Sequence, residues 1–298
     1  MRPVILDTDI GSDVDDILAL VMLAKSPELD LLGITTVYGD TILRAKIAKA
    51  TCQMLERPDP DIIPGAPKPI SGRQVYWAGH EGEGIPDLEA ISIDSAKKAE
   101  DYLVEKAKMH AGEIEILAIG PLTNVARAIE LSSDFAQQVK HLYLMGGAYW
   151  LDRPEHNIRC DVDAAQKVFD SGIPITAIGL DLTLRVWITE KDVKRISALP
   201  HQLGKTLENQ IRAWWVFRDL DRNHPHDPLA ALAMIRPELF RFEYCNVTVE
   251  RTGREFGKTI VSDSGKGKVR IASDVFALTA EKEIVDRIEG RSPGHAPA

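Results

Sequence analysis

Residues 3–16 of the chain are PVILDTDIGSDVDD, a short apolar run followed at once by a segment rich in aspartate. The run Pro3–Leu6 predicts a buried strand, and the pattern over Asp15–Lys25 predicts a helix that ends at Ser26-Pro27. A strand, a loop and a helix in this order are typical of the first unit of an α/β protein with a parallel sheet. This stretch therefore predicts an α/β fold with a parallel sheet.

The same alternation continues to about residue 180. Further strands are predicted at Leu31–Val37, Ile114–Ile119, His141–Met145 and Ile173–Ile178. Helices are predicted between them at Thr41–Glu56, Leu122–Glu130 and Ala164–Phe169. Residues 189–236 are expected to be mainly helical, residues 241–271 β-rich, and Asp274–Ile288 a closing helix.

These patterns predict a single α/β domain over residues 1–290. Its central sheet is expected to be mostly parallel and flanked by helices, in a Rossmann-like arrangement. The Gly- and Pro-containing segment 291–298 is predicted to be a flexible tail.

The composition excludes several classes of protein. The chain has 298 residues, 44% of them hydrophobic, which is enough to form a buried core. Its formal net charge is −9, whereas binding to nucleic-acid phosphates requires clustered Lys and Arg. No apolar run approaches the ~18–20 residues of a membrane span. We therefore expect neither a nucleic-acid partner nor a membrane association.

Two further observations concern the cellular compartment. Cys52, Cys160 and Cys245 are odd in number and lack the spacing of a metal site, so we expect reduced thiols. Met1 is followed almost directly by the first predicted strand, which leaves no room for a secretory signal peptide. The expectation is a cytoplasmic protein.

Five carboxylates lie within ten residues, directly after the first predicted strand: Asp7, Asp9, Asp13, Asp15 and Asp16. In a parallel sheet, the loops at the carboxyl ends of the strands face the ligand crevice. Like charges this close repel one another, and a divalent cation makes them compatible. Carboxylates without a nearby His–Cys set favour calcium or magnesium over zinc. Capping of the following helix would account for one or two of these aspartates, but not for five.

The Asp-x-Asp pair also fits a different enzyme. Haloacid-dehalogenase-like phosphatases place two functional aspartates two residues apart after their first strand, and Asp7 and Asp9 match that spacing. The further metal-binding acids of those phosphatases come far downstream, whereas Asp15 and Asp16 follow at once in this chain. A phosphatase is therefore an alternative function for this chain.

Further motifs follow the acidic loop in a fixed order. They are residues 35–40 (TTVYGD), 118–124 (AIGPLTN), 144–148 (LMGGA), 155–158 (EHNI), 179–183 (GLDLT) and 226–230 (HDPLA). Over residues 4 to about 235, this series resembles the inosine–uridine nucleoside hydrolase family. The resemblance implies a nucleoside hydrolase-like fold, a homo-oligomer, and calcium-assisted hydrolysis of the bond between a ribose and a nucleobase.

The resemblance also implies a metal site and two catalytic residues. Calcium would be held by Asp9, Asp16, the main-chain carbonyl of Thr123, and Asp227. Asp9 would also be the general base that activates water. His226 would protonate the leaving base, for which the ordinary histidine pKa of ~6.5 is suitable. Read locally, residues 226–228 are also a plain helix start with Asp227 as the cap.

Other residues are implied as substrate contacts. Ribose would be held by Asp15, Glu155, Asn157 and a backbone oxygen at Met145. Asp40 stands where the family usually has Asn. His80 lies in a Gly-rich loop, and the family often uses this region to cover the pocket. A histidine in a loop is, however, more often solvated than in contact with substrate. Trp214-Trp215 could stack on a purine, but adjacent aromatics on a helix point apart, so one is expected in the core.

The sequence leaves three points open. The acidic loop is two residues longer than the family pattern, so Asp13 competes with Asp15 and Asp16 for their roles. Neither the base nor the physiological substrate is determined, and a modified N-riboside is compatible with the motifs. A non-catalytic riboside-binding protein is a further alternative, against which Asp9 argues because binding needs it only as a metal ligand.

Overall fold

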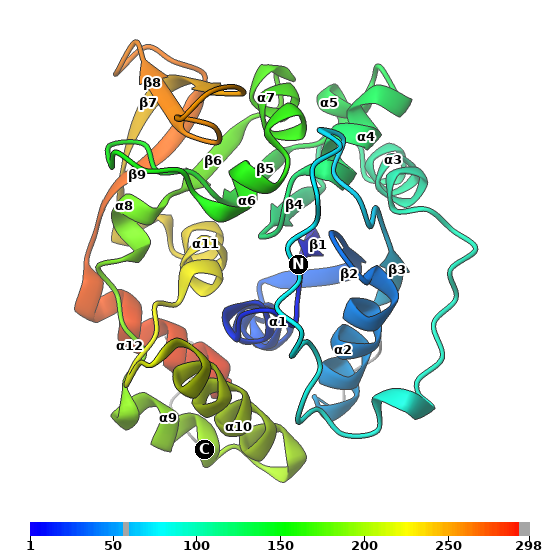
Figure 1. Ribbon diagram of the computed structural model, residues 1–298, viewed down its shortest axis with the longest axis vertical. Coiled ribbons are helices and arrows are strands. Elements are labelled where there is room, and N and C mark those ends of the chain that lie inside the picture. The colour runs from blue at the N-terminus through cyan, green and yellow to red at the C-terminus, as the bar shows by residue number, and fades with distance from the viewer. Residues whose placement is uncertain (56–59, 292–298) are drawn as a thin grey trace.

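A mixed β-sheet forms the centre of the computed structural model, which describes residues 1–55 and 60–291 (Figure 1). Its strands are β1 (Arg2–Thr8), β2 (Leu29–Thr36), β3 (Asp61–Pro64), β4 (Glu115–Ala118), β5 (His141–Met145), β6 (Ile175–Ile178), β7 (Phe240–Val249), β8 (Thr259–Ser262) and β9 (Val269–Val275). Their order across the sheet is β3-β2-β1-β4-β5-β6-β9-β7-β8. The first six and β9 run parallel, whereas β7 pairs antiparallel with both β9 and β8.

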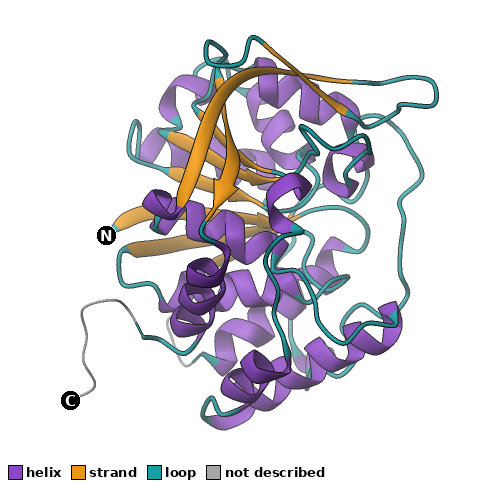
Figure 2. Ribbon diagram, turned by 90° about the vertical axis from the view of Figure 1, so that its left-hand side faces the viewer, coloured by secondary structure: helices purple, strands orange, loops and turns teal. Residues whose placement is uncertain are grey.

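Helices cover both faces of this sheet (Figure 2). They are α1 (Asp15–Lys25), α2 (Thr41–Met54), α3 (Ala99–Met109), α4 (Thr123–Leu131), α5 (Phe135–Gln138), α6 (His156–Cys160), α7 (Val162–Asp170), α8 (Leu180–Thr183), α9 (Glu190–Ser197), α10 (His201–Arg218), α11 (His226–Ile235) and α12 (Ala277–Ile288). One hydrophobic cluster joins α1, α2, α11 and α12 to the sheet, and a second joins α3, α4 and α7 to its other face. This is the predicted α/β architecture.

The strands read as continuous apolar runs because both of their faces are covered. Val4, Ile5 and Leu6 are all fully buried, as expected for a central strand of a parallel sheet. The predicted bounds of α1 and β5 agree with the structure residue for residue. The predicted helix end at Glu56 and the tail beyond Arg291 lie outside the described residues.

Several elements differ from the sequence prediction, and three of them have a clear physical reason. The closing helix begins at Ala277 rather than Asp274, because Asp274 and Val275 still pair with β7 in the sheet. Strand β3 was not predicted, since it has only four residues and includes a proline. Helix α3 was not predicted either; five of the eleven residues in its sequence AEDYLVEKAKM are charged, and it buries only four side chains.

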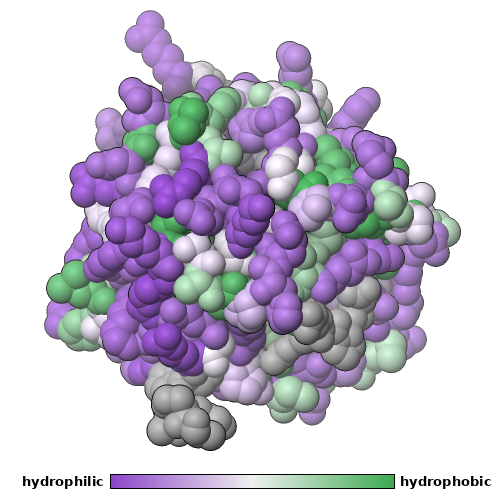
Figure 3. All heavy atoms as spheres, turned by 90° about the horizontal axis from the view of Figure 1, so that it is seen from below, coloured by the Kyte–Doolittle hydropathy of each residue, from purple (hydrophilic) through white to green (hydrophobic). Residues whose placement is uncertain are grey.

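The face of the molecule seen from below is that of an ordinary globular protein. Seen from below, the end that carries α9 and α10 is mostly hydrophilic, with small apolar areas between polar side chains (Figure 3). Within residues 1–55 and 60–291, no helix combines the length and the apolar character that crossing a membrane requires.

The sheet topology determines where a ligand can bind. Strand β1 lies between β2 and β4, so the chain runs outward from β1 in both directions. At such a switch point the loops after neighbouring strands separate and leave a crevice at the carboxyl edge of the sheet. The acidic loop follows β1 at this position.

Candidate active site

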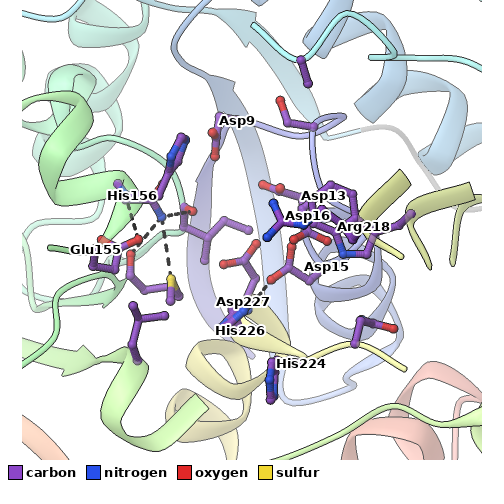
Figure 4. Close-up of a pocket in the computed structure, with 18 of the residues that line it drawn as sticks. Asp9, Asp13, Asp15, Asp16, Glu155, His156, Arg218, His224, His226 and Asp227 are labelled. Atoms are coloured by element: carbon purple, nitrogen blue, oxygen red, sulfur yellow. Dashed lines mark hydrogen bonds between the residues drawn. The ribbon is translucent and has the colours of Figure 1, made fainter. Parts of the chain in front are cut away.

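A cavity of about 500 Å³ opens at this edge of the sheet (Figure 4). Its walls come from the acidic loop, the loops after β2 and β5, the end of α10 and the start of α11. Six carboxylates line it: Asp9, Asp13, Asp15, Asp16, Glu155 and Asp227. The cavity therefore collects most of the acidic residues that the sequence singled out.

Three of these carboxylates form a compact group. Asp15 and Asp16 begin α1, and Asp227 is the second residue of α11. Each offers an oxygen, and the three oxygens lie within 4.8 Å of one another. The backbone N–H of Asp227 donates to Asp15 Oδ2 at 3.2 Å across 212 residues of sequence. Folding thus brings the distant acid to the acidic loop, as predicted.

Burial makes this group electrostatically unfavourable without a counter-charge. It raises the pKa values of Asp15, Asp16 and Asp227 well above their ordinary range, and repulsion from neighbouring carboxylates adds to the rise. Burial likewise raises the pKa of Asp13 to about 7. Clustered hard oxygens away from water are what a divalent cation such as calcium or magnesium prefers. The residues present therefore fit a divalent metal site.

The predicted ligand set overlaps this group but is not identical to it. Asp16 and Asp227 belong to both, whereas Asp15 is in the compact group and Asp9 lies beside it on the cavity wall. Thr123, the first residue of α4, is buried, and its hydroxyl donates to Asp161 Oδ2 at 2.6 Å. The Thr123 side chain is thus hydrogen-bonded to Asp161 and not to the carboxylate group, so its main-chain carbonyl remains the expected metal ligand.

The loop after β4 approaches Asp9 closely. A Cβ atom at Gly120 would lie 2.9 Å from both the backbone nitrogen and a side-chain oxygen of Asp9. It would also lie 2.8 Å from the Val37 side chain. Only glycine allows this approach, which explains its place in the AIGPLTN motif.

Three of the four residues predicted to hold ribose, Glu155, Asn157 and Met145, lie together on the wall opposite the carboxylate group that contains Asp15. Glu155 caps α6, with its carboxylate accepting from the backbone N–H groups of Asn157, Ile158 and Gly147 at 2.8–3.0 Å. The Asn157 side-chain amide donates to the carbonyl of Ile119 at 2.8 Å and to that of Met145 at 3.2 Å. Glu155, Asn157 and Met145 all line the cavity, and their contact with ribose stays a prediction.

His226 also lines the cavity, but its environment differs from the expectation. Its Nδ1 lies 2.7 Å from the Thr183 hydroxyl. Burial, with smaller contributions from the positive charges of His224 and Arg153, lowers the pKa of His226 to about 3. The imidazole is therefore neutral near pH 7, so the assumption of an ordinary pKa was wrong, and His226 can act there only as a neutral hydrogen-bond donor.

Asp40 and His80 occupy structural positions. Asp40 is exposed and caps α2, its carboxylate accepting from the Leu43 N–H at 2.9 Å. His80 Nε2 lies 2.9 Å from the Ser12 carbonyl, and its ring packs 4.4 Å from that of Phe217. Neither is among the described residues that line the cavity. Their positions do not support the predicted substrate contacts.

An aromatic wall, formed by Trp187, Trp214, Phe217 and His224, lines the cavity near His226. The Trp187 and His224 rings lie 3.6 Å apart, and those of Trp214 and Phe217 stack at 5.7 Å. Trp215, by contrast, is in the core, so the expected division of the tryptophan pair is correct. Trp187, Phe217 and His224 belong to no sequence motif. They were identified only because the fold brings their side chains to the same cavity.

Comparison with known proteins identifies the family. Residues 4–283 match the model of the inosine-uridine preferring nucleoside hydrolases. The chain belongs to this family. It is 33% identical over 279 residues to uridine nucleosidase 1 of Arabidopsis thaliana, covering 88% of this chain and 82% of that protein. It is 32% identical to a pyrimidine-specific ribonucleoside hydrolase of a Shewanella species, covering 87% and 86% of the two chains.

Solved structures agree with this assignment. A plant nucleoside hydrolase superimposes with a TM-score of 0.85 at 27% identity, over 97% of this chain and 99% of that one. A purine-preferring ribonucleoside hydrolase from Gardnerella vaginalis gives a TM-score of 0.81 at 27% identity, over 97% and 98% of the chains. The protein is thus a nucleoside hydrolase that cleaves the N-glycosidic bond of ribonucleosides, and the predicted family, fold and reaction are confirmed.

Proposed function

We propose that this nucleoside hydrolase is calcium-dependent, with Asp9 as its general base and the carboxylate cluster as its metal site. The observation that carries the proposal is the buried group of Asp15, Asp16 and Asp227 beside Asp9 in a single cavity. Glycosidic cleavage makes a cationic, oxocarbenium-like centre, and a cavity lined by carboxylates stabilises that charge.

The metal would be held by Asp9, Asp16, Asp227 and the Thr123 carbonyl. Asp15, in the same compact group, is available both to the ion and to the ribose hydroxyls. When bound, calcium supplies a positive charge that polarises water and orients the vicinal diol of the sugar. Its charge also offsets the repulsion among the buried carboxylates.

The chain's own residues perform the remaining steps. Asp9 takes a proton from the attacking water at the cavity floor. Asp15, Asn157, Glu155 and the Met145 carbonyl hold the ribose while its ring flattens. The aromatic wall stacks on the departing base, and neutral His226 donates a hydrogen bond to it.

The base preference is a further part of the proposal. The two relatives described above are named for uridine and for pyrimidine ribonucleosides, which makes uridine the first candidate substrate. The aromatic wall can stack on either class of base, because each presents a π-face. Purine nucleosides are therefore expected to react as well, more slowly.

A substrate panel tests the function. Purine, pyrimidine and modified ribonucleosides, together with 5′-monophosphates, are assayed for ribose and phosphate release in calcium buffer and with chelator. We expect ribose from the nucleosides, little reaction of the 5′-monophosphates because the cavity is acidic, and a loss of activity on chelation. Phosphate release faster than ribose release, or full activity with chelator, would contradict the proposal.

Homo-oligomerisation and a cytoplasmic location are further proposals. The first rests on the family resemblance and the second on three cysteines that lack the spacing of a metal site and are read as reduced thiols. Sedimentation equilibrium of the purified protein and cell fractionation test them.

A further inference from the structure

Arg44 is a fully buried cation beneath the acidic loop. It lies in the first turns of α2 and is 1% exposed. All of its hydrogen bonds go to uncharged oxygens. Nε donates to the Tyr38 carbonyl at 2.6 Å, and Nη2 donates to the Ser12 hydroxyl at 3.1 Å. Nη1 donates to the Ile10 carbonyl at 2.9 Å and also to the Asp9 carbonyl.

The charge of Arg44 is compensated without a direct ion pair. A guanidinium this deeply buried is costly unless opposite charge lies near it. Within the described part of the chain, no ion pair involves Arg44, yet it interacts electrostatically with Asp16. An ion pair would occupy carboxylate oxygens that a metal needs. Hydrogen bonds to carbonyls instead hold the loop and leave those oxygens available.

These contacts determine the course of the loop. Arg44 holds two successive carbonyls, at Asp9 and Ile10, just before the turn at Gly11, where φ is +117°. Through Tyr38 it ties this loop to the one that follows β2. The planar fork of arginine can reach all four oxygens at once, whereas a lysine ammonium cannot reproduce that geometry.

Neighbouring side chains support the same arrangement. The Trp77 ring covers the guanidinium at 5.0 Å. Ser12 is held from the other side, its hydroxyl donating to Glu81 Oε1 at 3.1 Å. The loop with two additional residues is therefore fastened by side chains from α2 and from the segment 77–81.

We propose that Arg44 is a positioning residue that holds Asp9 and the acidic loop in the conformation that binds the metal and activates water. This rests on the proposed function for its catalytic part, but its effect on metal binding can be measured separately.

The test compares Arg44→Lys and Arg44→Gln with Arg287→Lys, a control at another fully buried arginine remote from the cavity. Calcium affinity is measured by isothermal titration of the metal-free proteins, alongside kcat, KM and the melting temperature. We expect the Arg44 variants to bind calcium at least about tenfold more weakly and to lose about 10²-fold in kcat, with a smaller change in KM, because a small misplacement of catalytic groups has effects of that order.

The control separates positioning from general stability. Arg287→Lys should lower the melting temperature while leaving calcium affinity and kcat unchanged. Equal calcium affinity in Arg44→Lys and the native protein overturns the proposal, as does an equal loss in Arg287→Lys. A change confined to KM also overturns it, because that indicates a direct substrate contact.

Two further outcomes are distinguishable. If neither Arg44 variant folds, the test uses Ser12→Ala, which removes one of the four oxygens that accept hydrogen bonds from Arg44. Weaker calcium binding by Ser12→Ala supports the proposal, and unchanged calcium binding overturns it. If the native protein releases ribose from no nucleoside, the proposed function fails, while the calcium affinities still test Arg44.

Discussion

Asp9 stands where the first strand ends and the cavity begins, and every substrate needs the water that it would activate. Asp9→Asn retains the size of the side chain and one oxygen, but it removes the base. We expect kcat to fall by about 10²–10⁴-fold, the usual contribution of a general base, with binding of a ribose analogue largely retained. Steady-state kinetics and analogue titration check this. Near-normal turnover would contradict the mechanism.

His226 should matter only where the departing base needs help from the protein. Its lowered pKa of about 3 makes it a neutral donor, whose hydrogen bond is worth more to a poor leaving group. His226→Ala should therefore slow purine nucleosides more than a nitrophenyl riboside. The rates of both substrates are compared in the variant and the native protein. An equal loss of rate for both substrates would show that His226 does not assist the leaving base and only packs beside Thr183.

At the scale of elements, α12 is anchored to the start of β2 by a single buried arginine. Arg287 donates to both carboxylate oxygens of Glu28 at 2.8 and 3.0 Å and to Glu283 at 3.0 Å. Arg287 and Glu283 are buried, whereas the Glu28 side chain is 42% exposed, so the loss should lie at the low end of the about 3–5 kcal/mol typical of a broken buried pair. Arg287→Met should lower the free energy of unfolding by about 3 kcal/mol, because the apolar side chain fills the space but removes one of the two arginines that pair with buried Glu283, the other being Arg236.

Urea denaturation measures this loss as a lower midpoint with an unchanged m-value. The folded variant should hydrolyse nucleosides at the native rate, since no described residue of α12 lines the cavity. A loss of activity without a loss of stability would show that α12 influences the site.

For the whole molecule, the buried carboxyls link stability to pH and to metal. Burial raises the pKa of Asp13 from 3.8 to about 7, and those of Asp15, Asp16 and Asp227 are also raised. Between the unfolded and folded pKa values the native state binds more protons than the unfolded chain. The free energy of unfolding of the metal-free protein should therefore fall as the pH rises from about 4 to 7.

Calcium should oppose this loss, because it offsets the charges that ionisation creates. Thermal unfolding in chelator and in calcium, across the same pH range, measures both effects. The stabilisation by calcium should grow with pH. A stabilisation that is independent of pH would indicate that the ion binds elsewhere.

The sequence alone determined the features that depend on local pattern. Apolar runs spaced by amphipathic segments must pack as strands and helices, and the bounds of α1 and β5 followed residue for residue. Like charges directly after a buried strand pointed to a cation, because few other arrangements tolerate them. The strand β3 and the helix α3 were not predicted, because β3 is very short and few residues of α3 contribute to an apolar pattern.

Only the tertiary structure decided which groups share the cavity and in which state. It placed Asp227 against Asp15 and turned Asp40 away as a helix cap. It also buried His226 deeply enough to lower its pKa to about 3, and put Arg44 beneath the loop rather than in solvent. The physical reason is common to these cases: desolvation and contact depend on chain segments that are distant in sequence, and no local spacing specifies what will pack against a given side chain.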